Sequence, residues 1–188
     1  MSKFRVFVKT ALEKHPLVTN SIIYGSFCTI SEFSQQTSSK KFKTPPESYD
    51  TPAIARFAIY GTAIAGPLLY GWYGKILDKA IVGSTFKISM KKLLIDQFTF
   101  TPGLLGVFFV SMSLMERKED IFEECKQKFL PTFRTSCMFW IPAQLVNFML
   151  VPPLLRVTYI GGCSFAWINI LCYIKRQDVE TDRVQLNE

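Results

Sequence analysis

The sequence predicts an all-α fold: a multi-pass transmembrane helical bundle of four to five spans with an N-terminal amphipathic helix. Hydrophobic residues make up 48% of the 188 residues and the mean hydropathy is +0.18, values that are high for a soluble protein. The apolar residues form long blocks, and helices are what satisfies the backbone of such blocks in lipid. We expect one integral membrane domain over residues 1–188, with an amphipathic segment at 1–15 and a polar tail at 177–188.

The charge of the chain favours lipid as a partner. The net charge is +7, and the basic residues lie in the connectors between apolar blocks, where they would contact anionic headgroups of the bilayer. No recognised nucleic-acid-binding motif accompanies them, so we expect no direct binding of nucleic acid. A second copy of the chain, in a homo-oligomer, is a further candidate partner. The basic residues divide almost evenly between the two sides of the membrane, so charge favours neither orientation.

The residue types of most active sites are scarce. His15 is the single histidine, which nearly excludes catalytic triads and histidine-based metal sites. Neither a C-x-x-C pair nor a glycine-rich phosphate loop occurs, so we expect no metal, no cofactor and no enzymatic activity. Most of the cysteines lie within apolar blocks and read as small buried side chains; they are Cys28, Cys125, Cys137, Cys163 and Cys172.

Residues 2–14 have the apolar spacing of a short amphipathic helix, with basic residues on the other faces. This pattern fits either an interfacial helix on an anionic membrane or a mitochondrial presequence, and the short length favours the interfacial helix. The first candidate span, 17–33, is the weakest of the five, because Asn20 and Gln35 belong to a polar stripe along it. Such a helix needs protein partners in lipid.

The second candidate span, 53–73, carries small residues at four-residue intervals. Ala58, Thr62 and Gly66 form one such series, and Gly61 and Ala65 form another. This spacing lets two helix backbones approach closely. Pro67 predicts a kink after Gly66, and Trp72 suits the membrane interface.

The third candidate span, 93–115, has one polar sector that contains Asp96, Thr99 and Ser113. This sector should face other helices or water. Asp96 lies one turn from the membrane interface, so we favour a solvated or lysine-paired carboxylate over a proton relay. The following segment, 116–128, is dense in charges of both signs and predicts a surface helix outside the bilayer.

The fourth candidate span contains 21 uncharged residues between Arg134 and Arg156, enough to cross the hydrocarbon layer. Gln144 and Asn147 lie on one face at its middle, where they either bond to neighbouring helices or line a solute path; we favour the first. Prolines at 142, 152 and 153 predict a bent or broken helix. The fifth block, 157–174, places Asn169 on its polar face.

Several motifs resemble the peroxisomal membrane protein 22 kDa family, also called the Mpv-seventeen family. The family signature runs W-P-x-x-Q-x-x-N-F-x-x-V-P-x-x-x-R, and the chain matches it except that Ile141 replaces the first proline and Pro142 follows one residue later. The matching residues of the signature are Trp140, Gln144, Asn147, Phe148, Val151, Pro152 and Arg156. Further matches to family motifs are Gly66, Pro67, Trp72, Asp96, Gln97, Pro102 and Trp167.

The likeness covers nearly the whole chain, and residues 15–36 look most like the Mpv-seventeen-like branch. Membership implies a small protein of the mitochondrial inner membrane, which we favour, or of the peroxisomal membrane. Some relatives are described as weakly selective channels. Others are linked to reactive-oxygen handling, mitochondrial DNA maintenance or mitoribosome assembly.

Two functions are therefore open. The first is a channel for small metabolites, and the second is a structural or regulatory membrane protein that acts through a partner. Uncharged polar side chains suit a weakly selective path, and the same side chains can hold a bundle together. The candidate lining residues are Asn20, Gln35, Asp96, Thr99, Ser113, Gln144, Asn147 and Asn169.

Overall fold

The computed structural model describes residues 10–11, 13–41, 48–82, 85–150 and 163–174, and within them it contains helices and no strand. The predicted all-α class is confirmed for these residues. Two continuous helical stretches, Thr51–Leu77 and Phe86–Met115, are long and apolar enough to cross a membrane. Most of the predicted N-terminal amphipathic helix and all of the polar tail lie outside the described residues, and the count of four to five spans stays a prediction.

The first long helix, α2 (Pro16–Lys41), runs eight residues beyond the predicted end of the first span. Its C-terminal part is held by the chain that precedes the next helix. The Gln36 side chain donates to the backbone oxygen of Asp50 at 3.0 Å and accepts from the Asp50 backbone N–H at 2.9 Å. These two bonds satisfy the backbone N–H and C=O of Asp50, which lies just before the next helix, and they explain why helix persists past Phe33.

The second helical stretch starts at an Asp50 cap, whose side chain accepts from the N–H of Ala53 at 2.9 Å. It consists of α3 (Thr51–Ile59), η1 (Tyr60–Ala65), α4 (Gly66–Gly71), η2 (Trp72–Leu77) and α5 (Asp78–Ala80), where η marks a π-helical turn. The wider η1 turn comes directly before Pro67. A proline has no N–H and its ring crowds the preceding turn, so the chain accommodates it by widening.

The third stretch repeats this design. It consists of α6 (Phe86–Ile95), η3 (Asp96–Phe100) and α7 (Thr101–Met115), and the π-helical turn again lies just before a proline, Pro102. After α7, Arg117 has a positive φ of 56°, and the N–H of Lys118 donates to the carbonyl oxygen of Ser113. This left-handed C-cap turns the chain toward α8 (Glu123–Leu150).

Helix α8 differs from the sequence prediction in two respects. It runs without interruption through Pro131 and Pro142, so the predicted break does not occur at Pro142. The charged segment predicted as a separate surface helix divides instead into a turn at 116–122 and the first residues of α8. A proline removes one backbone bond, and packing of the rest of a long helix outweighs that loss.

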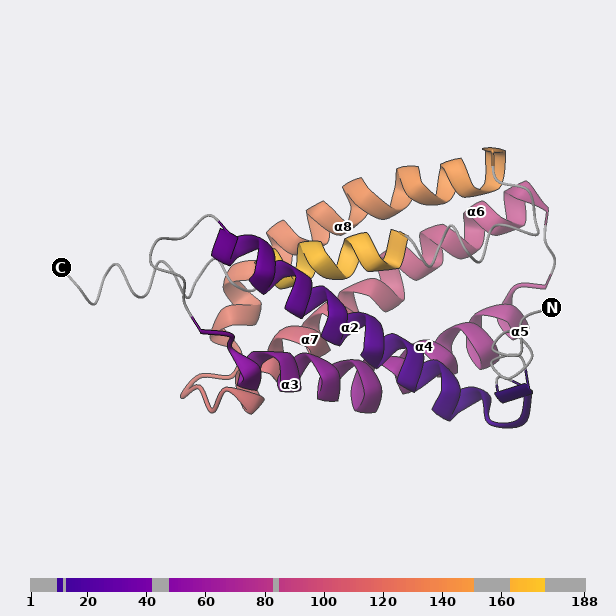
Figure 1. The fold of residues 1–188 in the computed structure, drawn as a ribbon. Coiled ribbons are helices and arrows are strands. Elements are labelled where there is room, and N and C mark those ends of the chain that lie inside the picture. The colour runs from indigo at the N-terminus through magenta and orange to yellow at the C-terminus, as the bar shows by residue number, and fades with distance from the viewer. Residues whose placement is uncertain (1–9, 12, 42–47, 83–84, 151–162, 175–188) are drawn as a thin grey trace.

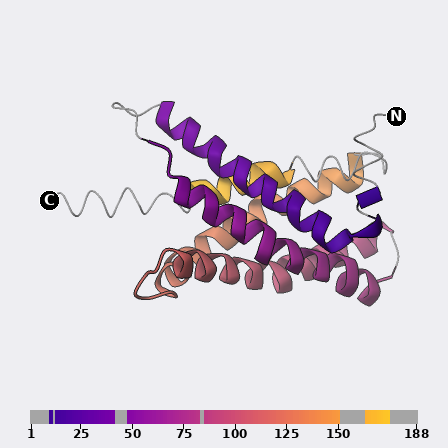
Figure 2. The same cartoon turned by 60° about the horizontal axis from the view of Figure 1, so that its bottom comes forward.

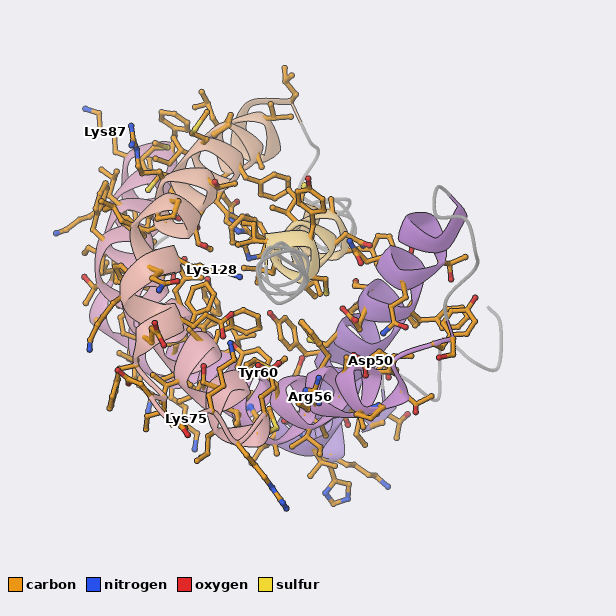
Figure 3. The ribbon with its side chains drawn as sticks, turned by 90° about the vertical axis from the view of Figure 1, so that its left-hand side faces the viewer. Asp50, Arg56, Tyr60, Lys75, Lys87 and Lys128 are labelled. Carbon is orange, nitrogen blue, oxygen red and sulfur yellow. The ribbon has the colours of Figure 1, made fainter. Side chains whose placement is uncertain are left out.

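The last described helix, Cys163–Ile174, lies between α2 and α8 in Figure 1 and at the centre of the bundle in the end view of Figure 3. Two of its residues, Ile168 and Cys172, belong to the main core with Phe108 and Phe109 of α7. Its Trp167 packs in a second cluster with aromatic residues of α8. The central helix is therefore buried on more than one side, against α7 and against α8.

Helix α2 crosses the second helical stretch at close range, as Figure 2 also shows. A Cβ atom at Gly61 would lie 2.8 Å from the Cα of Gly25 and 2.7 Å from the sulfur of Cys28. A Cβ atom at Gly66 would lie 2.6 Å from the Cα of Ser21. The small residues expected in this span therefore do form a helix crossing, in which glycine is required because backbone faces backbone.

Candidate functional site: a polar stripe along α8

Helix α8 carries a row of buried polar side chains at four-residue intervals. Residues four apart share one face of an α-helix. All four side chains in the row are at most 8% exposed, although the helix otherwise buries aromatic and aliphatic groups. We call this row the α8 stripe; it comprises Glu124, Lys128, Thr132 and Ser136.

At its outer end the stripe is a buried ion pair with several partners. Glu124 accepts from the hydroxyl of Ser113 at 3.2 Å and from the Nζ of Lys118 at 3.2 Å. The Nζ of Lys128 lies 3.5 Å from the same carboxylate. It also donates to the backbone carbonyl oxygen of Ile174, the last described residue of the central helix, at 2.9 Å. A buried charge needs such partners.

The ion pairs continue across the end of the bundle. The Nε of Arg56 lies 3.6 Å from Glu116 and its Nη2 lies 4.0 Å from Asp50, while Lys118 lies 3.8 Å from Glu116. Figure 3 labels Asp50, Arg56 and Lys128 in a view along the bundle. We call the set the charged end network, and its three basic and three acidic side chains balance; they are Arg56, Lys118, Lys128, Asp50, Glu116 and Glu124.

The inner part of the stripe reaches the π-helical turn η3. Gln97 is 1% exposed, and its Nε2 donates to the hydroxyl of Ser136 at 3.1 Å and to the sulfur of Cys137 at 3.4 Å. Thr132 lies between Lys128 and Ser136 and is fully buried, and its hydroxyl oxygen has no hydrogen-bond partner in the part of the chain that the structure describes. Thr135 on the same helix donates instead to its own helix, at the carbonyl of Pro131.

A second group of buried polar side chains lies on α2. The Nδ2 of Asn169 in the central helix donates to the hydroxyl of Ser31 at 3.3 Å. Gln36 donates to the carboxylate of Glu32 at 2.8 Å. Gln35 is 9% exposed, and its side-chain oxygen has no hydrogen-bond partner within the described ranges. The polar stripe predicted for this helix therefore faces protein along its C-terminal half.

The candidate lining residues occupy several different places. Asn20 is exposed and donates to the carbonyl of Pro16 in its own helix, and Thr99 is exposed. Ser113 belongs to the outer end of the α8 stripe. Gln144 is half-buried on α8, two turns beyond Ser136, and Asn147 lies on α8 with its side chain outside the described part.

Asp96 is half-buried, and its hydrogen-bond partners among the described residues are aromatic donors and not a lysine. Its two carboxylate oxygens accept from the indole Nε1 of Trp72 and from the hydroxyl of Tyr73, both at 2.8 Å. The Trp72 ring also stacks on Phe100, with ring centroids 4.8 Å apart. Trp72 and Tyr73 lie in the π-helical turn η2, and Asp96 lies in η3. The residue spacing of a regular α-helix does not predict that these side chains face one another.

The family-motif residues serve mainly as packing groups. Gly66 is at the helix crossing, while Pro67 and Pro102 follow π-helical turns. Trp140 and Trp167 lie 6.4 Å apart between ring centroids, edge to face. Phe148 lies on α8 with its side chain outside the described part, and Pro152 and Arg156 lie outside the described residues.

The α8 stripe was missed at the sequence level. The segment 116–128 was treated as a surface element, so Glu124 and Lys128 were not connected to Thr132 and Ser136. The signal that would have found them is the regular four-residue spacing of polar residues, which runs through Pro131 without interruption.

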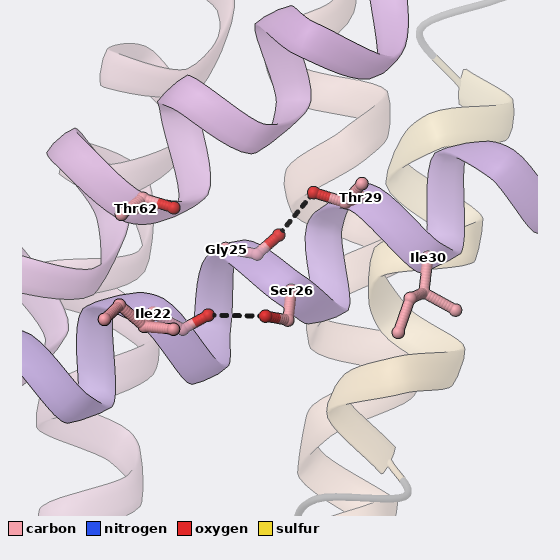
Figure 4. A pocket seen from close by; sticks show the side chains of 6 residues that line it. All are labelled: Ile22, Gly25, Ser26, Thr29, Ile30 and Thr62. Carbon is pink, nitrogen blue, oxygen red and sulfur yellow. Dashed lines mark hydrogen bonds between the residues drawn. The ribbon is translucent and has the colours of Figure 1, made fainter.

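A shallow groove of about 350 Å³ lies on the outer side of the α2 crossing (Figure 4). Ile22, Ile30 and Thr62 are among its lining residues. Its two serine and threonine hydroxyls on α2 donate to carbonyl oxygens of the same helix, from Ser26 and Thr29. The groove therefore presents a mostly apolar surface, as a lipid-facing helix does.

Residues 113–172, which include the α8 stripe, match the Mpv17 / PMP22 family. The chain is 32% identical to an Mpv17-like protein of Xenopus laevis, over 89% of this chain and 80% of the relative. It is 31% identical to PXMP2/4 family protein 4 of Dictyostelium discoideum (89% and 94%), and 28% identical to peroxisomal membrane protein 2 of Bos taurus (83% and 81%). No solved structure matches. The resemblance seen in the sequence motifs is thus confirmed, and the chain belongs to the Mpv17/PMP22 family.

Proposed function

We propose that this protein is a channel in an organelle membrane that passes small metabolites with weak selectivity, along a path lined by the α8 stripe. The single observation that carries the proposal is the buried Thr132 hydroxyl, which has no hydrogen-bond partner among the described residues. Leaving a hydroxyl unbonded in an apolar interior costs about 1–3 kcal/mol by mutational measures. Water or solute on a path along α8 would supply the missing bond.

The charged end network supports weak selectivity at one mouth of this path. In the described part of the chain, its three cations and three anions form a neutral set. A ring of one charge sign would attract or exclude ions strongly, whereas a neutral polar mouth discriminates mainly by size. Small metabolites of either sign are therefore the expected solutes.

A second candidate function is a non-channel structural or regulatory protein that acts through a partner, such as mitochondrial DNA maintenance or mitoribosome assembly. The observation that favours it is that most polar atoms of the α8 stripe already bond to protein. Ser136 accepts from Gln97, and Lys128 bonds to Ile174. In this case the stripe only fastens the central helix in place.

The deciding experiment is solute flux into liposomes that contain the purified protein. The parent should pass small uncharged and charged solutes above the rate of empty liposomes. Thr132→Val keeps the side-chain volume and removes the hydroxyl, so flux should fall while stability is unchanged or higher, because no protein hydrogen bond is lost. The matched control is Thr135→Val, whose hydroxyl bonds to its own helix; its flux should equal the parent's.

Absence of flux in the parent would end the channel proposal. Flux that survives T132V would remove the α8 stripe from the path. The variant Q144L/N147L extends the test toward the other end of α8. If those amides line the path, flux falls at unchanged stability; if they only bond helices together, stability falls by about 0.6 kcal/mol for each hydrogen bond.

For the compartment, we propose the mitochondrial inner membrane, with the peroxisomal membrane as the alternative. The support is the basic amphipathic start of the sequence for the first, and the name of the bovine relative for the second. A C-terminally tagged protein imaged with markers of both organelles tests this. Signal confined to peroxisomes would reverse the order, and signal at the plasma membrane would dismiss both.

A further inference from the structure

The lysines at the two ends of the bundle differ in their ion pairing. At the end where α7 turns into α8, Lys118 of the turn and Lys126 and Lys128 of α8 each lie within 4 Å of a carboxylate. At the opposite end, where Figure 1 places α5 and the start of α6, four lysines are exposed. We call these four the lysine rim; they are Lys75, Lys79, Lys87 and Lys91.

No lysine of the rim forms a salt bridge within the described part of the chain. Lys75 contacts a ring face, with its Nζ 5.8 Å from the ring centroid of Tyr70. Asp96, whose neighbours Lys91 and Lys92 precede it on α6, directs both carboxylate oxygens to Trp72 and Tyr73. The carboxylate of Asp96 is thus occupied by aromatic donors, and no carboxylate among the described side chains pairs with the rim lysines.

Apolar side chains are exposed among these lysines. Ile76 is 53% exposed, Val82 is 81% exposed and Phe86 is 49% exposed. Trp72 and Tyr73, fixed by Asp96, lie beside them in η2. Exposed apolar groups, interfacial aromatics and lysines in one short stretch of chain match the layers of a bilayer surface, where acyl chains end and headgroups begin.

We infer that the lysine rim binds the headgroups of anionic phospholipids in the leaflet at the α5–α6 end of the bundle. The anionic phosphates meet the lysine ammonium groups while Ile76, Val82 and Phe86 enter the acyl region. Each lysine near an anionic surface strengthens association by about five-fold, and salt weakens it. The inference does not depend on whether the protein conducts solutes.

The full chain, reconstituted in vesicles that contain brominated lipid, provides the test. Trp72 lies at the rim, so its fluorescence, taken as the difference between the parent and Trp72→Phe, reports which lipid is adjacent. Brominated phosphatidylglycerol should quench Trp72 more than brominated phosphatidylcholine, and added salt should reduce the difference. The variant K87Q/K91Q should lose most of this preference, by about five-fold per lysine.

The matched control is R117Q/K126Q, which removes the same charge from two exposed residues at the opposite end of the bundle; it should keep the preference. Equal loss in both double variants would show a net-charge effect and overturn the inference. Competition by inorganic phosphate at constant ionic strength would make the ligand a free phosphate and overturn it too. If the parent protein shows no preference for phosphatidylglycerol, the inference is also overturned. An acidic protein would then be the candidate partner of the lysine rim.

Discussion

Lys128 of α8 donates to the carbonyl oxygen of Ile174 at 2.9 Å, so a residue of the outer bundle bonds to the last described residue of the central helix. The same ammonium group lies 3.5 Å from Glu124. One buried lysine therefore bonds to a backbone carbonyl of another helix and neutralises a buried carboxylate at once.

Replacing this lysine should destabilise the protein strongly. Lys128→Met keeps most of the apolar stem, but it leaves the Ile174 carbonyl without this donor and Glu124 with one basic partner fewer. Loss of one member of a buried pair costs about 3 kcal/mol or more. Thermal unfolding in detergent measures the effect. The control is Lys126→Met, at an exposed pair with Asp120, which should leave the midpoint nearly unchanged.

The helix crossing predicts opposite effects for one substitution at two glycines of the same helical stretch. Gly61→Ala should destabilise by about 1–3 kcal/mol, because the new methyl group would meet the backbone of Gly25. Gly71→Ala has nothing within 4 Å of the new atom. It should stabilise the helix by about 0.5–1 kcal/mol. Equal unfolding midpoints for the two variants would contradict the close crossing.

The contact between Asp96 and the two aromatic donors should be sensitive to loss of the carboxylate. Asp96→Leu removes both acceptor oxygens, so both bonds at 2.8 Å are lost. A hydrogen bond to a charged group contributes about 1.5–3 kcal/mol. Unfolding in detergent and the emission wavelength of Trp72 should both change. Tyr73→Phe, which keeps the Trp72 bond, should affect stability less and leave that wavelength near the parent's.

Asp120 gives a prediction for acid pH. The N–H of Phe122 donates to its carboxylate at 2.8 Å, and Lys126 lies nearby, so the pKa of Asp120 is lowered by the fold. A lowered pKa means that this carboxylate stabilises the folded state above its unfolded pKa of about 3.9, and the contribution is lost as the pH falls through the folded pKa. The difference in unfolding midpoint between the parent and Asp120→Asn should therefore shrink below about pH 4. A difference that does not change between neutral and acid pH would contradict the prediction.

The sequence by itself determined the helical class, the family and the small-residue crossing of the second span. Blocks of apolar residues admit few backbone solutions in lipid, and residues such as Gly61 and Gly66 act through spacing along one helix. Both signals are local, so they could be read without knowing which helices are neighbours. The polar stripe of α2 was also visible in the sequence, and Asn169 and Ser31 proved to be in contact.

The tertiary structure alone decided the partners of the polar residues. Glu124 and Lys128 look like surface charges until α7 and the central helix bring Ser113 and Ile174 against them. The π-helical turns before Pro67 and Pro102 shift the faces of their helices, so Asp96 meets two aromatic donors instead of lysine. The physical reason is that a buried polar group is defined by its partner, and the partner here lies on another helix, at a distance along the chain that periodicity does not encode.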